Sequence, residues 1–191
     1  AALLPLGLFL KSMPVRLASA AVVSLTVCKV FMLDMTAPTG ALRAFSFIGL
    51  GVLPGLFVAV HFPRFATYEP IALQTGLGLL AALLALVLFR LTHKALGKMW
   101  SVSLDIRDKH KLVTSGIYRR VRHPMYTAFW TMALAQALLL PNWIAGLSGL
   151  VGFGTLFFLR VGPEEAMMEE TFGEDYRDYK ARTARIIPGI Y

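Results

Sequence analysis

The sequence predicts an all-α integral membrane protein, a helical bundle with about five transmembrane helices. Of its 191 residues, 57% are hydrophobic and only 16% are charged, whereas soluble domains usually carry about a quarter charged residues. Uncharged runs long enough to cross a bilayer alternate with short polar segments. The length fits one compact unit, so we treat residues 1–191 as a single membrane domain.

The formal net charge of +8 does not indicate a nucleic-acid-binding protein. The basic residues flank apolar runs, which the positive-inside rule and contact with anionic lipid headgroups explain directly. The single cysteine, Cys28, cannot form a disulfide within the chain. The sequence has no Cys/His pattern typical of a metal site, so we expect no metal.

Three spans are predicted in the first half of the chain, at residues 15–33, 42–61 and 70–92. Pro54 is expected to kink the second span. The third span contains 19 uncharged residues from Ile71 to Phe89. Its stretch 76–81 matches a dinucleotide fingerprint on paper, but that motif requires a preceding strand. The glycines of this stretch are therefore expected to serve helix packing.

Residues 93–123 form the most polar segment. Nine Lys or Arg residues lie between Arg90 and His123, against two aspartates. This asymmetry predicts that the segment faces the cytoplasm.

A hairpin of two antiparallel helices, at about 124–140 and 142–160, is predicted from the next 36 uncharged residues. The turn signal is Pro141-Asn142-Trp143. Such a hairpin returns both outer ends to one surface, so the segments 107–126 and 160–179 should meet there. In the polar segment 161–191, Pro163 is expected to begin a new helix, and Gly173 is expected to end it. A short helix at about 174–184 and a closing segment at 186–188 should follow.

Several blocks of these polar segments carry a resemblance to a known family. They are His110-Lys111-Leu112-Val113-Thr114-x-Gly116-Ile117-Tyr118, Arg122-His123-Pro124-x-Tyr126, Arg160, Glu164-Glu165, Phe172-Gly173 and Tyr176-x-x-Tyr179. In order and spacing they resemble the isoprenylcysteine carboxyl methyltransferase family over about residues 42–190. The resemblance implies an all-helical membrane protein with a cytoplasmic cofactor pocket. It also implies methylation, by S-adenosylmethionine, of the carboxylate of a prenylated cysteine.

The resemblance also indicates the site residues. The expected cofactor-binding residues are His110, Leu112, Val113, Gly116, Tyr118, His123, Pro124, Tyr126, Glu164 and Glu165. The expected catalytic residues are Arg160, Glu165 and Arg122. Aromatic faces and carboxylates stabilise a sulfonium, and arginine binds a carboxylate in a two-point fork. An ionised carboxylate needs no general base, so Arg160 is expected to orient the acceptor.

Other functions stay open at this stage. The acceptor could be an amine, as in phospholipid methyltransferases, or a small thiol. A reductase that uses NADPH and a non-enzymatic membrane protein are readings of another class. We expect a lipophilic substrate that enters from the bilayer, contacts with membrane lipids and no nucleic acid. The sequence does not predict an oligomeric state.

Overall fold

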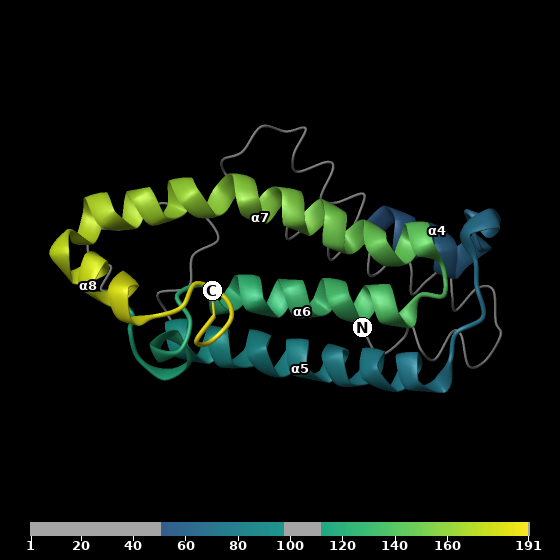
Figure 1. Cartoon of the computed structure of the whole chain (residues 1–191), viewed down its shortest axis with the longest axis horizontal. Helices are drawn as coiled ribbons and strands as arrows, with labels where there is room; N and C mark the ends of the chain where they lie inside the picture. The colour runs from purple at the N-terminus through teal and green to yellow at the C-terminus, as the bar shows by residue number, and fades with distance from the viewer. Residues whose placement is uncertain (1–50, 98–111, 191) are drawn as a thin grey trace.

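The computed structural model describes residues 51–97 and 112–190, and this part of the chain is helical. The helices are α4 (Leu53–Val60), α5 (Ala72–Leu96), α6 (Pro124–Leu139), α7 (Trp143–Phe172) and α8 (Glu174–Arg182), with short 3₁₀ turns η2 (Arg64–Ala66) and η4 (Gly116–Arg119). Figure 1 shows α5, α6 and α7 lying lengthwise beside one another, with α8 at one end and α4 at the other. Within the described ranges the only β pairings are two isolated bridges, Thr67 with Asn142 and Val121 with Ala184.

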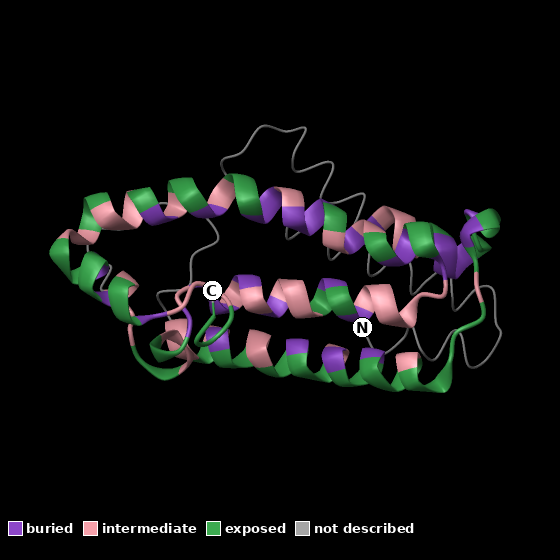
Figure 2. Ribbon diagram, in the orientation of Figure 1, coloured by how far each residue is buried: buried purple, intermediate pink, exposed green. Residues whose placement is uncertain are grey.

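Among the described helices, α5 and α7 are long and apolar enough to cross a membrane. Helix α5 covers the span predicted at 70–92. Its outer face is exposed along its length (Figure 2). The exposed residues of α5 include Leu73, Leu77, Leu80 and Leu84. Such a continuous apolar face is typical of a helix that contacts lipid. The predicted span at 15–33, and most of the one at 42–61, lie outside the described residues. The described end of the latter is α4, with Pro54 in its first turn.

Small residues let α5 approach α6 closely. A Cβ added at Gly78 would lie 2.8 Å from the Leu139 side chain, and Ala81 and Ala85 are buried. Close approach at small residues is how membrane helices pack in the absence of a hydrophobic driving force. The predicted packing role of the glycine-containing stretch is confirmed at Gly78 and is wrong at Gly76, which is exposed and where an added Cβ would meet no described residue within 4 Å.

The hairpin is formed by α6 and α7, but α7 is longer than predicted. The expected helix start at Pro163 is wrong: α7 is one helix of 30 residues, with Pro163 inside it. A proline in a helix interior removes one backbone hydrogen bond, and here that loss does not end the helix. At 1.5 Å per residue α7 is about 45 Å long, which exceeds the roughly 30 Å apolar core of a bilayer. Its last turns therefore extend beyond the apolar layer.

Asn142 fixes the turn between α6 and α7. Its side chain accepts a hydrogen bond from the Ala145 amide at 2.9 Å and so caps α7. It also donates to the Pro63 carbonyl at 2.6 Å and to the Thr67 hydroxyl at 3.2 Å. The buried asparagine thus joins the hairpin turn to the loop after α4.

The C-terminal segment folds back onto the start of α6. Gly173, at φ +56°, ends α7 as predicted and leads directly into α8. The amides of Arg122 and His123 donate to the carbonyls of Ala184 and Arg185 at 2.8 and 3.0 Å. Ile186 packs against the buried aromatic cluster. These contacts close one end of the bundle, which we call the polar end: η4, the first turn of α6, the last turns of α7, and α8 with residues 183–190.

Candidate active site

The polar end gathers the charged side chains of the hairpin around Glu165. Only 4% of the Glu165 side chain is exposed. Its Oε1 accepts hydrogen bonds from Arg122 Nε at 3.2 Å, Arg122 Nη2 at 3.0 Å and Arg185 Nε at 3.1 Å. Its Oε2 accepts one from Arg185 Nη2 at 3.0 Å and lies 3.6 Å from Lys180 Nζ. One buried carboxylate therefore holds cations from the segment before α6, from α8 and from the C-terminal segment.

Each nitrogen of the Arg122 guanidinium has a hydrogen-bond partner. Besides Glu165, its Nη1 donates to the carbonyl of Lys180 at 3.1 Å and to that of Thr183. Its side chain is 8% exposed. Since the guanidinium has five N–H donors in a rigid fork, these contacts fix α6, α7 and the C-terminal segment relative to one another. In this geometry Arg122 has a structural role.

His123 lies between the two adjacent glutamates. Its Nε2 is 3.2 Å from Glu165 Oε1, and its Nδ1 is 3.8 Å from Glu164 Oε1. The imidazole stacks on Tyr126, with ring centroids 5.4 Å apart. His123 thereby connects the Glu165 cluster to a second group of side chains.

This second group contains Tyr126, Glu164 and Arg160. The Tyr126 hydroxyl donates to Glu164 Oε2 at 2.5 Å, and Arg160 Nε lies 3.7 Å from the same oxygen. Arg160 is 12% exposed in its side chain. Its buried Nε and Nη1 have no hydrogen-bond partner among residues 51–97 and 112–190. A buried guanidinium with unused donors is costly unless an acceptor binds there.

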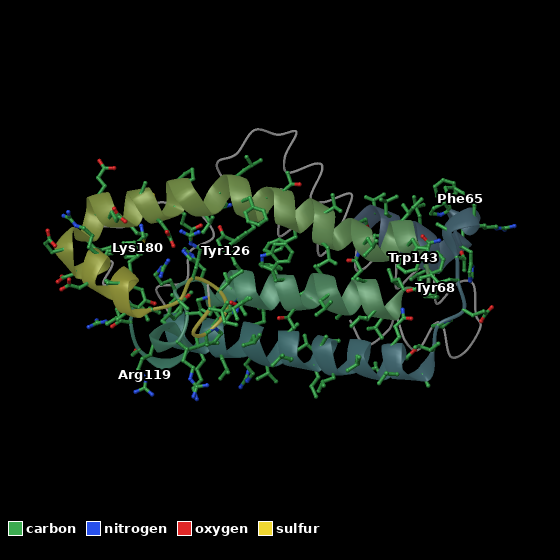
Figure 3. The ribbon with its side chains drawn as sticks, in the orientation of Figure 1. Phe65, Tyr68, Arg119, Tyr126, Trp143 and Lys180 are labelled. Carbon is green, nitrogen blue, oxygen red and sulfur yellow. The ribbon has the colours of Figure 1, made fainter. Side chains whose placement is uncertain are left out.

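Aromatic rings pack around Tyr126 of this group, and we call Tyr126, Phe153 and Phe157 the aromatic floor. Tyr126, Phe153 and Phe157 are buried together, with Trp130 packed against them. The rings of Tyr126 and Phe157 meet edge to face at 5.3 Å. Gly154 allows this packing, because a Cβ there would lie 3.0 Å from the Trp130 ring. Figure 3 shows Tyr126 in the space between α6 and α7.

Tyr118 contributes its backbone carbonyl to the polar end. The Tyr179 hydroxyl donates to the Tyr118 carbonyl at 2.6 Å. Burial raises the pKa of Tyr179 to about 12 and raises the pKa of Tyr118 as well, so both phenols stay protonated at neutral pH. Gly116 precedes Tyr118 at φ +63°, a left-handed conformation that favours glycine.

The structure brings together most of the predicted site residues. Direct contacts join Arg122, His123 and Tyr126 from one polar segment to Glu164 and Glu165 from the other. Pro124 is buried and begins α6, whereas Leu112 and Val113 are half-buried in the approach to η4. His110 lies outside the described residues. No group of three or more metal-ligating side chains occurs in the ranges 51–97 and 112–190.

Sequence reasoning missed Arg185 and Lys180 as partners of Glu165. The available signal was the basic composition of residues 180–185, opposite the acidic stretch 164–175. Composition alone does not say which cation reaches which carboxylate.

Comparison with known proteins identifies the relatives of this chain. The model of the "Isoprenylcysteine carboxyl methyltransferase (ICMT) family" matches residues 74–170, just over half of the chain. The match contains Arg122 to Tyr126, Arg160 and Glu164-Glu165, and it is narrower than the resemblance over 42–190. A second family model, described as "Predicted membrane protein (DUF2339)", matches residues 1–62.

Individual relatives of the chain are named as isoprenylcysteine methyltransferases. The chain is 37% identical over 94 residues to the protein-S-isoprenylcysteine O-methyltransferase of Dictyostelium discoideum, covering 47% of this chain and 38% of the relative. It is 36% identical to the human protein of that name over 44% of this chain and 29% of the relative. It is 28% identical to protein-S-isoprenylcysteine O-methyltransferase B of Arabidopsis thaliana, over 74% and 71%. The chain thus matches less than half the length of the first two relatives.

Proposed function

The chain belongs to the isoprenylcysteine carboxyl methyltransferase family, and on this basis we propose that it methylates the carboxylate of a lipophilic, isoprenylcysteine-like acceptor. The methyl donor is S-adenosylmethionine. The relatives are named for O-methylation of isoprenylcysteine. The proposal extends that activity to this chain because the arginine and the two glutamates of the site lie within the matched region.

The unused donors of Arg160 carry the proposal. Two of its nitrogens are buried without a hydrogen-bond partner among the described residues, and its one ion-pair contact, to Glu164, is long at 3.7 Å. These two nitrogens point to opposite sides of the guanidinium, so one carboxylate cannot accept from both. The carboxylate of the acceptor would accept a charge-assisted hydrogen bond from Nη1.

The chemistry asks little more of the protein than positioning. A carboxylate is already ionised at neutral pH and needs no base. The residues must hold its oxygen in line with the methyl group and exclude water. Arg160 orients the carboxylate, and the aromatic floor of Tyr126, Phe153 and Phe157 keeps the neighbouring space dry.

The donor-binding residues fit a cationic ligand. S-adenosylmethionine, when bound, supplies an electrophilic methyl group on a sulfonium. Glu164 offers a carboxylate, and Tyr126 and Tyr118 offer aromatic rings, the groups that stabilise such a cation. Leu112, Val113 and Gly116 would accommodate the adenosine part. Arg122 and Glu165, predicted from the sequence to be catalytic, are proposed instead to position other residues. Glu165, together with Arg122, Arg185 and His123, holds Glu164 and Tyr126 in register.

The site is proposed to face the cytoplasm in a multi-pass bundle of about five spans. The positive charge between Arg90 and His123 supports this orientation. The acceptor would reach Arg160 from the bilayer, since α7 carries both the apolar face and the arginine.

Calorimetric binding tests the donor. Purified protein in detergent should bind S-adenosylmethionine and S-adenosylhomocysteine but not NADPH, and Tyr126→Ala should weaken binding. Binding of NADPH in place of the methyl donor would favour the reductase and refute the proposal.

Turnover tests the acceptor. With a labelled methyl donor and an S-farnesylcysteine derivative, product should release its label as methanol in base, as a methyl ester does. Arg160→Ala should reduce turnover about a hundredfold, the order of a lost hydrogen bond to a charged group, while donor binding persists. Arg177→Ala is the matched control, because Arg177 is 58% exposed on α8. A base-stable product would indicate an amine acceptor.

A further inference from the structure

A cavity of about 470 Å³ opens at the polar end beside the site. Four arginines line it: Arg120 and Arg122 from the segment between η4 and α6, and Arg182 and Arg185 from α8 and the segment after it. Among the described residues, none that lines the cavity is acidic. The cavity is wide open to solvent, so it suits a ligand that stays partly exposed at the surface.

The arginines of the cavity are not neutralised equally. Arg122 and Arg185 share the buried carboxylate of Glu165. Arg120 and Arg182 are exposed and take part in none of the ion pairs between described residues. The rim of the cavity thus carries two guanidinium groups available to an anion.

The lining also includes one large apolar residue, Ile190, which is 81% exposed. Ile187, three residues earlier in the chain, is 46% exposed. An inorganic anion would use the arginines alone. A phosphate attached to an acyl chain would also cover these isoleucines, which favours an amphipathic ligand.

The position along the bundle agrees with a lipid ligand. The apolar run of α7 ends at Leu159, one residue before Arg160. The lining includes Arg122, which bonds Glu165, five residues beyond Arg160. This contact puts the cavity on the polar side of that boundary, which is the level of phosphate headgroups if the apolar run lies in a bilayer, and arginine binds phosphate in a two-point fork.

We propose that this cavity binds the phosphate of an anionic phospholipid headgroup, as a ligand and not as the methyl acceptor. The site is separate from the carboxylate-binding Arg160, so it goes beyond the methyl transfer proposed above and does not depend on it. The lipid would anchor the C-terminal segment against the membrane surface.

Binding of short-chain lipids to the full chain in detergent tests this proposal. Dioctanoyl phosphatidate should bind and dioctanoyl phosphatidylcholine should not. The double variant Arg120→Gln/Arg182→Gln should weaken phosphatidate binding about thirtyfold. This factor corresponds to about 2 kcal/mol of binding free energy, or about 1 kcal/mol for each arginine. The matched control Arg64→Gln/Arg177→Gln should change it less than about twofold. Both pairs are measured at one ionic strength.

Competition and further variants distinguish the possible ligands of the cavity. Inorganic phosphate should not displace the lipid; if it binds as tightly as phosphatidate, the site recognises free phosphate and the lipid proposal is wrong. Displacement of the lipid by S-adenosylmethionine would assign the cavity to the methyl donor and overturn the proposal. Arg120→Lys/Arg182→Lys should keep most of the binding, and methyl transfer in detergent should be unchanged in all these variants. Equal binding of phosphatidate by Arg120→Gln/Arg182→Gln and by the wild type would also refute the lipid proposal.

Discussion

Replacing Glu165 with alanine should strongly destabilise the protein, because it leaves buried cations without their counter-ion. Arg122 is 8% exposed and uses Glu165 for two of its hydrogen bonds. Arg185 donates two more, and His123 lies 3.2 Å away. Removing one partner of a buried ion pair costs about 3–5 kcal/mol.

The matching change in melting temperature can be worked out from chain length. For 150–250 residues, each kcal/mol shifts the melting temperature by about 2–4 °C. Glu165→Ala should therefore melt roughly 6–20 °C below the wild type. Thermal unfolding in detergent, followed by circular dichroism, measures this shift.

Glu169 provides the matched control. It lies one turn further along α7 and pairs with Lys180 at 2.6 Å, but both side chains are more than a third exposed. Exposed pairs contribute about 0–1 kcal/mol, so Glu169→Ala should lower the melting temperature by at most about 4 °C. Equal shifts in the two variants would refute the view that Glu165 holds the polar end together.

Three further predictions concern positions away from Glu165. Tyr179→Phe removes the hydrogen bond to the Tyr118 carbonyl and should cost about 1 kcal/mol in denaturant unfolding. Since burial raises the pKa of Tyr179 from about 10 to about 12, its contribution is present below pH 10 and is lost as the pH rises to 12. The variant should show a smaller loss over that interval, and an equal loss would contradict the assignment. Gly116→Ala, at φ +63°, should cost roughly 1–2 kcal/mol, whereas Gly162→Ala in α7 should be neutral or stabilising in the same assay. Asn142→Ala should cost about 2–3 kcal/mol from the lost cap and loop contacts; a melting temperature equal to that of the wild type would contradict this.

The sequence by itself was enough to predict the helical class, the span at α5 and the hairpin of α6 and α7. Each of these follows from local information: a run without charge, a turn signal at Pro141-Asn142, or a glycine after a helix at Gly173. The order of the polar blocks also indicated the family, which the match over residues 74–170 established.

The tertiary structure decided how far α7 continues and what each charged side chain does. Pro163 is a helix-start signal when only its neighbours are considered. In the folded chain, Glu164 and Glu165 are held by Tyr126, Arg122 and Arg185, and the helix continues through the proline. Those partners lie 20 to 43 residues away in sequence, and no periodicity specifies them. For the same reason the unused donors of Arg160, unlike the occupied ones of Arg122, become visible only once the helices are packed.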